Sequence, residues 1–552
     1  MYKLLPNTAL IIKITFYFQI VFHLATSMAS AGSDRHILSL QSFQINNVHF
    51  IGNEKFTSET LNQLLKPYFN KNLRLSDLHK LQKKITSHYV EHGYVNSGAI
   101  IPEQDLINNT LKIEVVEGVL SKTVIVNEGR LNDSYIDERI RLHMSSGLNI
   151  NTLKQNVYLL QKDERIAQVN SRLSPGKKLG ESILNIKIKE ENPFHLDFET
   201  NNYRSASVGE VQGIIKARHM NVSGRGDALV AEISLSEGAD SQFLEYSLPV
   251  SARGNLIRLG YSKSKYEIIE EPFDVFNITN TTTGFFIGTS KFLVRNLDRL
   301  SQISITLEQR NNNSELLGQS TAFTPGLEDG QSMVRAVQIS HLGRKFDRNN
   351  DLAFRYGVNF YEVTYNALNL QEKTNFNSEG EHPVKSQLQD TASDSDYALA
   401  DKLSLKLYGQ IQWVSRFGKW KFRLKTDVQI TPDTLAASER FSLGGIHSIR
   451  GYRENAIARD NGVKSNFELY IPLLAQYQLY LVPFIDVGYS WNDKTETSLP
   501  KVLSSVGSGL DWSYKEKIHA RIFYAKALQD IASNENVWQD QGIHAQLLWR
   551  VM

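Results

Sequence analysis

The 552-residue chain contains no cysteine, which excludes disulfides, thiolate metal sites, iron–sulfur clusters and cysteine nucleophiles. Its charge is nearly balanced, with 61 Lys and Arg against 59 Asp and Glu, so its composition gives no support for nucleic-acid binding. Hydrolase, zinc-protease and nucleotide-binding motifs are absent as well, and the 14 histidines are scattered. We therefore expect no enzyme, no metal site and no cofactor.

Long apolar runs are also missing after residue 31, where none reaches the ~18 residues that a membrane-spanning helix needs. Before that point, Lys3 and Lys13 precede an apolar stretch at 14–25, and small residues lead up to Ala31. This pattern predicts an export signal at 1–31, cleaved near Ala31. An uncleaved anchor helix is the alternative, but the stretch is short and contains Lys13. An exported chain without a later helical span is either soluble or a β-barrel.

Two segments of similar length follow, at 43–118 and 119–192. Each alternates in the order strand, two helices, two strands, so we interpret them as an internal repeat of two small α/β modules. In the first module Thr57 and Ser76 stand just before the two helical stretches, and we predict that they are the N-caps.

The remaining residues, 194–552, show strand patterns only. In the segment 403–413 (LSLKLYGQIQW), leucines, Ile411 and Trp413 occupy one face, and polar side chains occupy most of the other. About 16 such segments of roughly ten residues can be placed, which is the length of a tilted barrel strand. A soluble β-sandwich produces the same alternation, so the pattern by itself leaves both folds open.

The lengths of the connections favour a barrel. Short turns at 251–255 and 415–418 alternate with long polar segments at 265–283 and 431–464. Short turns at one rim and long loops at the other are typical of outer-membrane barrels, whereas a sandwich has no reason to sort loops in this way.

Several short motifs resemble the POTRA domains of two-partner secretion outer-membrane transporters. In the first module these are HGY at 92–94, PEQ at 102–104 and VVEG at 115–118. In the second, LSPG at 173–176 with GES at 180–182 is similar to the end of the second POTRA domain of that family.

Two further motifs resemble the lid loop and a wall strand of the same family and of the wider Omp85 superfamily. The segment GGIHSIRGY lies in the polar stretch 431–464, which we call the lid loop, and FIDVG follows later in a strand. The motif residues are Ile449, Arg450, Gly451 and Tyr452 in the loop and Phe484, Asp486 and Gly488 in the strand. The resemblance implies that the loop folds back into the lumen and that Arg450 pairs with Asp486.

Elementary electrostatics agrees with that pairing. An aspartate facing lipid is costly, so Asp486 should face the lumen and seek a cation, and the planar fork of Arg450 bonds a carboxylate twice. Phe484 and Asp486 share one face of the strand, so one of the two is out of place in a simple wall. The alternative is a solvated Arg450 and a lone lumenal Asp486.

The resemblance implies a fold of two POTRA domains followed by a 16-stranded antiparallel transmembrane β-barrel. It implies an outer-membrane transporter of a Gram-negative bacterium that secretes, with or without activating, a large partner such as a hemolysin or adhesin. The POTRA domains, in the periplasm, would bind the partner in extended form by β-augmentation. We expect a monomer in contact with outer-membrane lipid and no nucleic-acid partner.

Three alternatives stay open. The first is an assembly insertase of the Omp85 superfamily, although such insertases usually carry three or more POTRA domains. The second is a passive porin, which predicts neither periplasmic modules nor matched loop and wall motifs. The third is a surface enzyme, for which no catalytic group of residues is visible.

Two departures from the family pattern lead to further expectations. Some members carry an N-terminal helix and a linker that plug the pore, whereas only about eleven residues separate Ala31 from Phe43 here. The lid loop is then the main obstruction, and we expect a more conductive resting channel. The chain also ends in WRVM (549–552) instead of a final aromatic residue, so the insertion signal should be weaker or shifted.

Overall fold

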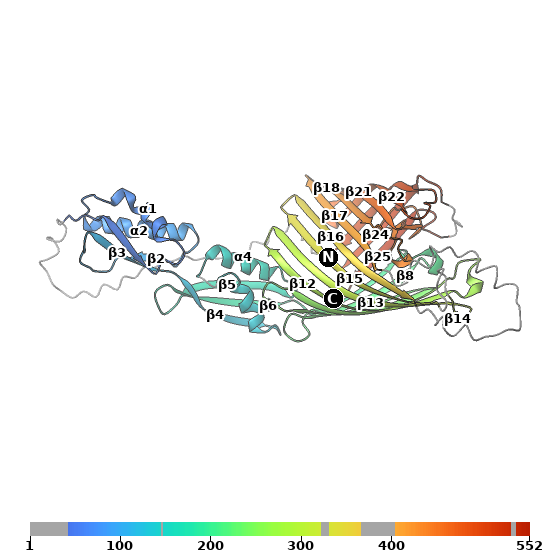
Figure 1. Cartoon of the computed structure of the whole chain (residues 1–552), viewed down its shortest axis with the longest axis horizontal. Coiled ribbons are helices and arrows are strands. Elements are labelled where there is room, and N and C mark those ends of the chain that lie inside the picture. The colour runs from blue at the N-terminus through green and yellow to red at the C-terminus, as the bar shows by residue number, and fades with distance from the viewer. Residues whose placement is uncertain (1–41, 145–146, 322–329, 366–402, 532–536, 552) are drawn as a thin grey trace. The chain divides into compact units, whose positions relative to one another are not determined.

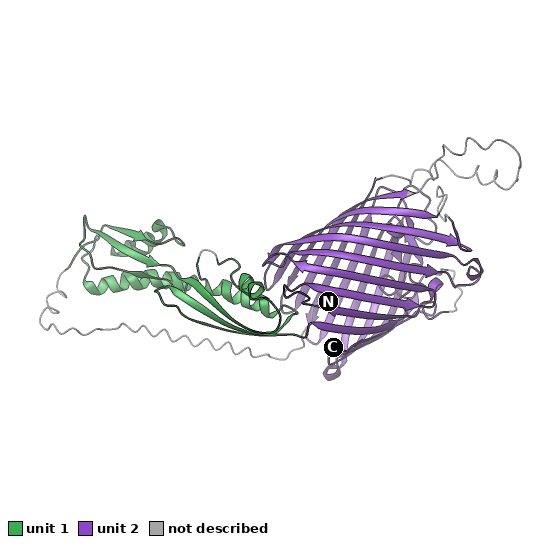
Figure 2. Cartoon of the chain, turned by 90° about the horizontal axis from the view of Figure 1, so that it is seen from below, with its two compact units in different colours: residues 1–191 green, residues 192–552 purple. Residues whose placement is uncertain are grey.

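Two compact units make up the chain, Met1–Glu191 and Asn192–Met552, shown in green and purple in Figure 2. The computed structural model describes residues 42–144, 147–321, 330–365, 403–531 and 537–551. The predicted export signal and the segment expected to be too short for a plug helix therefore lie outside the described residues, as does Met552. No helix in the described ranges combines the length and the apolarity needed to cross a membrane.

The first unit begins with a small α/β module. Its elements are β1 (Asn47–Ile51), α1 (Ser58–Leu65), η1 (Lys66–Tyr68), α2 (Leu75–Glu91), β2 (Gly98–Ile100) and β3 (Thr110–Val116). The sheet order is β1-β3-β2, with β1 parallel and β2 antiparallel to β3. Both helices bury apolar side chains against this sheet, and Leu81, Ile85 and Tyr89 of α2 are fully buried.

A second module repeats this order with its own core. Its elements are β4 (Val119–Glu128), α3 (Asp133–Ile140), α4 (Ile150–Gln161), β5 (Ile166–Pro175) and β6 (Glu181–Glu190). The sheet order is β4-β6-β5, so the last strand again lies in the middle, parallel to the first (Figure 1). The repeat expected from the sequence is thus present as two modules of the same topology.

The helix starts of the first module were predicted with mixed success. Thr57 is the N-cap of α1, as expected, because its hydroxyl accepts a hydrogen bond from the Thr60 NH at 3.3 Å. Ser76 is not the N-cap of α2, which already begins at Leu75. The Asp77 carboxylate instead accepts from the backbone NH of Arg74 at 2.9 Å, so the acidic residue after Ser76 stabilises this start.

The second unit is a closed antiparallel β-barrel. Within the described residues its wall has sixteen strands, since β14 (Gln319–Ser320) pairs only with β13 and extends a hairpin. The wall strands are β7 (Phe194–Asn201), β8 (Gln212–His219), β9 (Ala228–Ser236), β10 (Ala239–Pro249), β11 (Leu256–Glu267), β12 (Thr279–Arg295), β13 (Arg299–Leu316), β15 (Gln331–Phe346), β16 (Asn350–Tyr365), β17 (Leu403–Phe417), β18 (Trp420–Ile430), β21 (Asn461–Leu474), β22 (Leu479–Trp491), β23 (Val502–Tyr514), β24 (Ile518–Ala527) and β25 (Ile543–Arg550). β25 pairs with β7 and closes the sheet, so the wall has no free edge in the part of the chain that the structure describes. The predicted fold class is confirmed.

The two faces of the wall differ as expected. On β13, Ile303, Ile305 and Leu307 point outward and are well exposed, while Ser304 and Thr306 between them belong to the inner face. The outward face is therefore an apolar belt and the inward face is polar, the reverse of a soluble sandwich. This arrangement is typical of a transmembrane barrel with a water-filled lumen.

Connection lengths differ between the two rims of the described barrel, with two exceptions. At one rim the connections are short, such as 347–349 and 418–419, and at the other they are long, such as 268–278 and 528–542. The exceptions are 220–227, eight residues at the short-turn rim, and 237–238, a tight hairpin at the long-loop rim. The Gly238 NH donates to the carbonyl of Val208, so a neighbouring loop covers this hairpin.

Candidate functional site

The lid loop occupies the connection between β18 and β21, which is shorter than the sequence suggested. β21 begins at Asn461, so the last four residues of the expected range 431–464 belong to the wall, and the name lid loop is kept below for 431–460. The end of the loop was predicted too late in the chain because Gly462 and Lys464, which face the lumen at the start of β21, look like loop residues in the sequence. Within the loop, β19 (Phe441–Leu443) and β20 (Ile457–Arg459) pair as a small hairpin.

The tip of the loop makes a tight turn against the inner wall. The Gly445 NH donates to the Tyr452 carbonyl at 3.1 Å, which closes the turn around the motif. Gly451 has φ of +86°, and a Cβ there would lie 3.1 Å from the backbone oxygen of Ala525 on β24. Both facts require glycine at this position, because an L side chain would be strained and would push the loop off the wall.

Arg450 meets Asp486 of β22 inside the barrel. Its Nε and Nη2 atoms donate to the Oδ2 and Oδ1 atoms of Asp486, each at 2.7 Å. The backbone NH of Arg450 adds a third bond to Oδ2 at 3.1 Å. Arg450 is 2% exposed and Asp486 is 0% exposed, so the pair is shielded from bulk water. We call this contact the Arg450 clamp.

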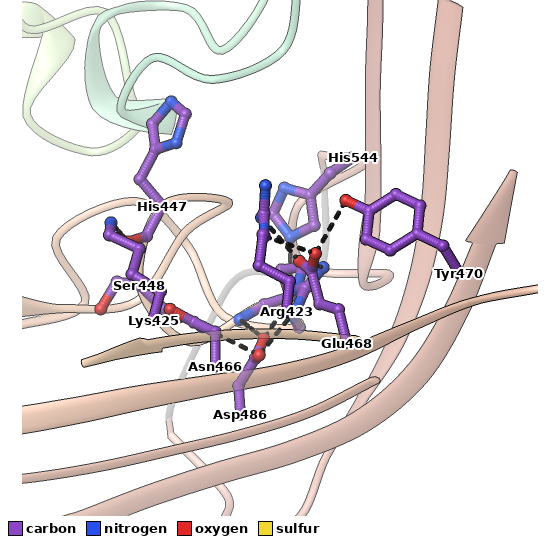
Figure 3. A network of polar contacts seen from close by, with 11 residues as sticks. Arg423, Lys425, His447, Ser448, Asn466, Glu468, Tyr470, Asp486 and His544 are labelled. Carbon is purple, nitrogen blue, oxygen red and sulfur yellow. Dashed lines mark hydrogen bonds and ion pairs between the residues drawn. The ribbon is translucent and has the colours of Figure 1, made fainter. Parts of the chain in front are cut away.

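A second carboxylate shares the cation. Nη1 of Arg450 donates to Oε1 of Glu468 on β21 at 3.0 Å, and Arg423 of β18 donates to the same oxygen at 3.0 Å. The Tyr470 hydroxyl donates to the other Glu468 oxygen at 2.9 Å (Figure 3). Two arginines thus face two carboxylates, and the buried charges balance.

Asn466 joins the loop to the wall beside this group. Its side-chain amide donates to Oδ1 of Asp486 at 2.8 Å and to the Ser448 carbonyl of the lid loop (Figure 3). On the far side of the loop, the Gly451 NH donates to Nε2 of the buried His544 on β25 at 3.3 Å. The motif is therefore bonded to strands on both of its sides.

Phe484, which looked out of place in the sequence, lies under the arginine. It shares the lumenal face with Asp486 and is 4% exposed, and the Arg450 guanidinium carbon stands 3.4 Å from its ring centroid. A second ring, Phe523 of β24, lies 5.1 Å from the same carbon. The aromatic side chain is thus a cation–π partner of the clamp.

The other motif residues pack the loop onto the wall. Ile449 and Tyr452 are buried in an apolar cluster with Leu503 of β23, and the Tyr452 hydroxyl lies 3.0 Å from the Ser504 carbonyl. A Cβ at Gly488 would come within 2.6 Å of Leu443, so glycine makes room for the loop. All seven predicted motif residues therefore belong to one contact region.

The predicted site residues do not include six of the participants, namely Arg423, Asn466, Glu468, Tyr470, Phe523 and His544. One signal could have found three of them. Asn466 is the antiparallel partner of Asp486 and Glu468 that of Phe484, so the polar alternation N-F-E-L-Y of β21 marks its lumenal face. Among the described residues no group of three or more His, Asp and Glu side chains is arranged to hold a metal.

Comparison with known proteins gives a family for this architecture. Residues 180–512 match the family described as haemolysin secretion/activation protein ShlB/FhaC/HecB, and residues 43–118 match the ShlB-type POTRA domain. The chain belongs to this family. Its members are outer-membrane transporters of secreted proteins, so the barrel lies in the outer membrane and the POTRA domains lie in the periplasm.

Individual relatives are distant but extend over most of the chain. The heme/hemopexin transporter protein HuxB of Haemophilus influenzae strain 86-028NP is 23% identical, over 88% of this chain and 84% of that protein. The outer membrane transporter CdiB of Dickeya dadantii is 23% identical, over 83% and 77%. The hemolysin transporter protein HpmB of Proteus mirabilis is 22% identical, over 76% and 70%.

Solved structures show the same fold. CdiB from Escherichia coli has a TM-score of 0.67 at 19% identity, covering 96% of this chain and 93% of that one. BamA from Haemophilus ducreyi without POTRA domains 1–3 has a TM-score of 0.54 at 15% identity, covering 92% and 100%. At these identities the likeness concerns the fold alone.

Proposed function

We propose that this transporter secretes one large exported protein, which its POTRA domains bind in extended form and which then passes through the barrel when the lid loop moves. The observation that carries this proposal is the Arg450 clamp, a loop held inside the lumen only by non-covalent contacts. A fixed plug needs no such balanced ion cluster, whereas a movable one must be held in place and still be able to leave.

Capture of the partner is assigned to the outer edge of β5. Among the described residues only β6 pairs with β5, and the Val169 NH points away from β6, because it donates to Oε1 of Gln161 at 2.7 Å. Outward and inward backbone groups alternate along a strand, so Ser171 and Leu173 also direct their NH and C=O groups outward. Pro175 is two residues further on and also faces outward. Proline has no backbone NH, and it is tolerated there because an outward position makes no hydrogen bond to β6. An extended segment of the partner would add to this edge as a new strand.

Passage through the lumen requires the clamp to open. The buried Arg450 is balanced by Asp486 and Glu468, so separating them leaves charges unpaired in a poorly hydrated place, which costs several kcal/mol. This cost keeps the loop in place at rest. An entering chain that offers its own polar groups, together with water, would lower it.

The barrel unit is proposed to work as a monomer surrounded by lipid. Its wall is closed by β25 and β7, so the strands that the structure describes leave no edge to pair with a second copy. Its outward side chains are apolar, as a lipid-facing wall requires.

An assembly insertase of the same superfamily is the alternative function. The test is a strain that lacks the gene for this chain, compared with the same strain carrying the gene on a plasmid. The proposal predicts that one large protein disappears from the surface or medium, while the other outer-membrane barrels keep their abundance. Loss of many barrels at once would instead support the insertase and contradict the proposal.

A further inference from the structure

The first arm of the lid loop, residues 431–440, is bonded to a part of the wall that the Arg450 clamp does not touch. Glu439, which is 5% exposed, lies between two cations. Its Oε2 accepts from Nζ of Lys406 on β17 at 2.7 Å, and its Oε1 accepts from Nη2 of Arg310 on β13. Since β15 and β16 separate these two strands, one carboxylate holds the arm across four strands of the wall.

Backbone contacts fix the same residue. The Glu439 carbonyl accepts from Nζ of Lys406 at 3.2 Å and from Nε2 of Gln429 on β18 at 3.0 Å. Nearby, the Leu435 NH donates to Oδ1 of Asp460 at 2.9 Å, which joins the two ends of the loop. The arm is thus held by charge, by its backbone and by its own other end.

Under the arm lies an apolar patch on the lumenal face of the wall. Leu435 is 0% exposed and packs in a cluster with Val334 and Ala336 of β15 and Tyr361 and Val363 of β16. Apolar side chains on the wet face of a barrel are costly unless they are covered. The patch is therefore shielded from water when the arm lies over it, which stabilises the closed position of the arm.

We infer that Glu439 is the positioning residue of a second gate, in which the first arm of the lid loop closes the lumen over β13–β17 independently of the Arg450 clamp. The gate is closed because the Glu439 carboxylate pairs with both Arg310 and Lys406. Without its carboxylate these two cations repel each other, and the arm keeps only its backbone contacts and the packing of Leu435. The inference rests on the proposed function, since a gate has meaning only in a transporter.

Thiol labelling tests the gate without any partner, because the chain has no cysteine of its own. Val334→Cys places one thiol under Leu435, where the wild-type side chain is 2% exposed. Adding Glu439→Gln should accelerate labelling by a membrane-impermeant reagent at least about tenfold. Equal labelling rates in a barrel that is still folded, judged by its heat-dependent gel mobility, would overturn the inference.

Two controls separate the gate from general loosening. Glu308→Gln removes another acid from Arg310, whose Nε lies 3.2 Å from Oε1 of Glu308, but it does not touch the lid loop. It should leave the labelling rate of Val334→Cys unchanged. Arg450→Ala should also leave it unchanged, and acceleration there would show that the two contacts open together, which contradicts the inferred independence. Failure of the proposed function would appear separately, in the secretion assay of the deletion strain.

Discussion

At the scale of single residues, the Arg450 clamp depends on what surrounds the cation. Asp486 takes two parallel hydrogen bonds, Glu468 takes the third nitrogen, and Phe484 covers one face of the guanidinium. Lysine has no planar fork and cannot satisfy these contacts together, so arginine is required and not merely a positive charge.

Replacing Phe484 tests the aromatic contribution. Phe484→Leu keeps an apolar side chain of similar reach but removes the cation–π contact, so we expect the clamp to weaken by about 1–2 kcal/mol. The measurement is single-channel recording in planar bilayers, where the variant should show more frequent open events than the wild type. Ile485→Leu changes the lipid-facing neighbour and should leave the recordings unchanged. If the two variants behave alike, the ring under Arg450 has no part in holding the loop.

The sequence predicted the pair itself but not its environment. Arg450 stands between glycines in a polar loop and Asp486 interrupts an apolar strand, so both residues are conspicuous, and the family resemblance joins them. Glu468 and Arg423 are not conspicuous, because every second residue of a barrel strand is polar for general reasons. Alternation can place Glu468 on the lumenal face of β21, but which wall residues meet Arg450 follows from strand register, which one sequence does not give.

At the scale of elements, the open edge of β5 makes a sharp prediction. Ser171→Pro removes an outward-pointing NH without removing a bond to β6, so the second POTRA domain should stay folded while the edge loses a donor. Partner secretion should fall at least about tenfold. Ser171→Ala keeps the NH and removes only the hydroxyl, and its secretion should stay at the wild-type level. A proline variant that is folded by circular dichroism and still secretes normally would remove β5 as the binding edge.

Element boundaries were harder to predict where a polar residue fits two local structures equally well. Near the start of β21, Gly462 and Lys464 face the lumen, and the sequence does not distinguish such positions from a loop. At the start of α2, Ser76 and Asp77 are both residues that commonly cap helices. Which of them does so depends on the residue at which the first turn begins, and the sequence alone does not give that residue.

At the scale of the whole molecule, alternation and loop length were enough to predict the barrel. These properties repeat over many strands, so single errors average out. The short hairpin at 237–238 was not predictable, because its cover comes from the backbone near Val208, which is distant in sequence. The two POTRA modules were recognisable because each repeats one order of elements around its own core.

The first unit has its own two cores and should fold without the barrel, which allows a pH test. Burial alone would raise the pKa of Asp163 in the second module, but the Arg165 charge and hydrogen bonds from Tyr135 and Arg165 bring it below its usual range. The resulting stability is complete above the ordinary carboxylate pKa and is lost as the pH falls through the lowered folded-state value.

Urea unfolding of residues 42–191 at a series of pH values measures this effect. Asp163→Asn should destabilise the unit by about 2–3 kcal/mol at neutral pH and should flatten the decline in acid. Glu164→Gln alters the exposed neighbouring residue and should reproduce the wild-type curve. An unchanged acid slope in Asp163→Asn would show that this carboxylate does not control the stability of the unit.

The most direct test of the whole account is secretion of the partner by Arg450→Ala, measured beside Arg440→Ala, which removes a more exposed arginine of the same loop. Both barrels should assemble, as their heat-dependent gel mobility will show. A loop without the clamp has no single resting position to leave and return to, so we expect Arg450→Ala to reduce secretion at least about tenfold, while Arg440→Ala has much less effect. Wild-type secretion by an assembled Arg450→Ala barrel would contradict it.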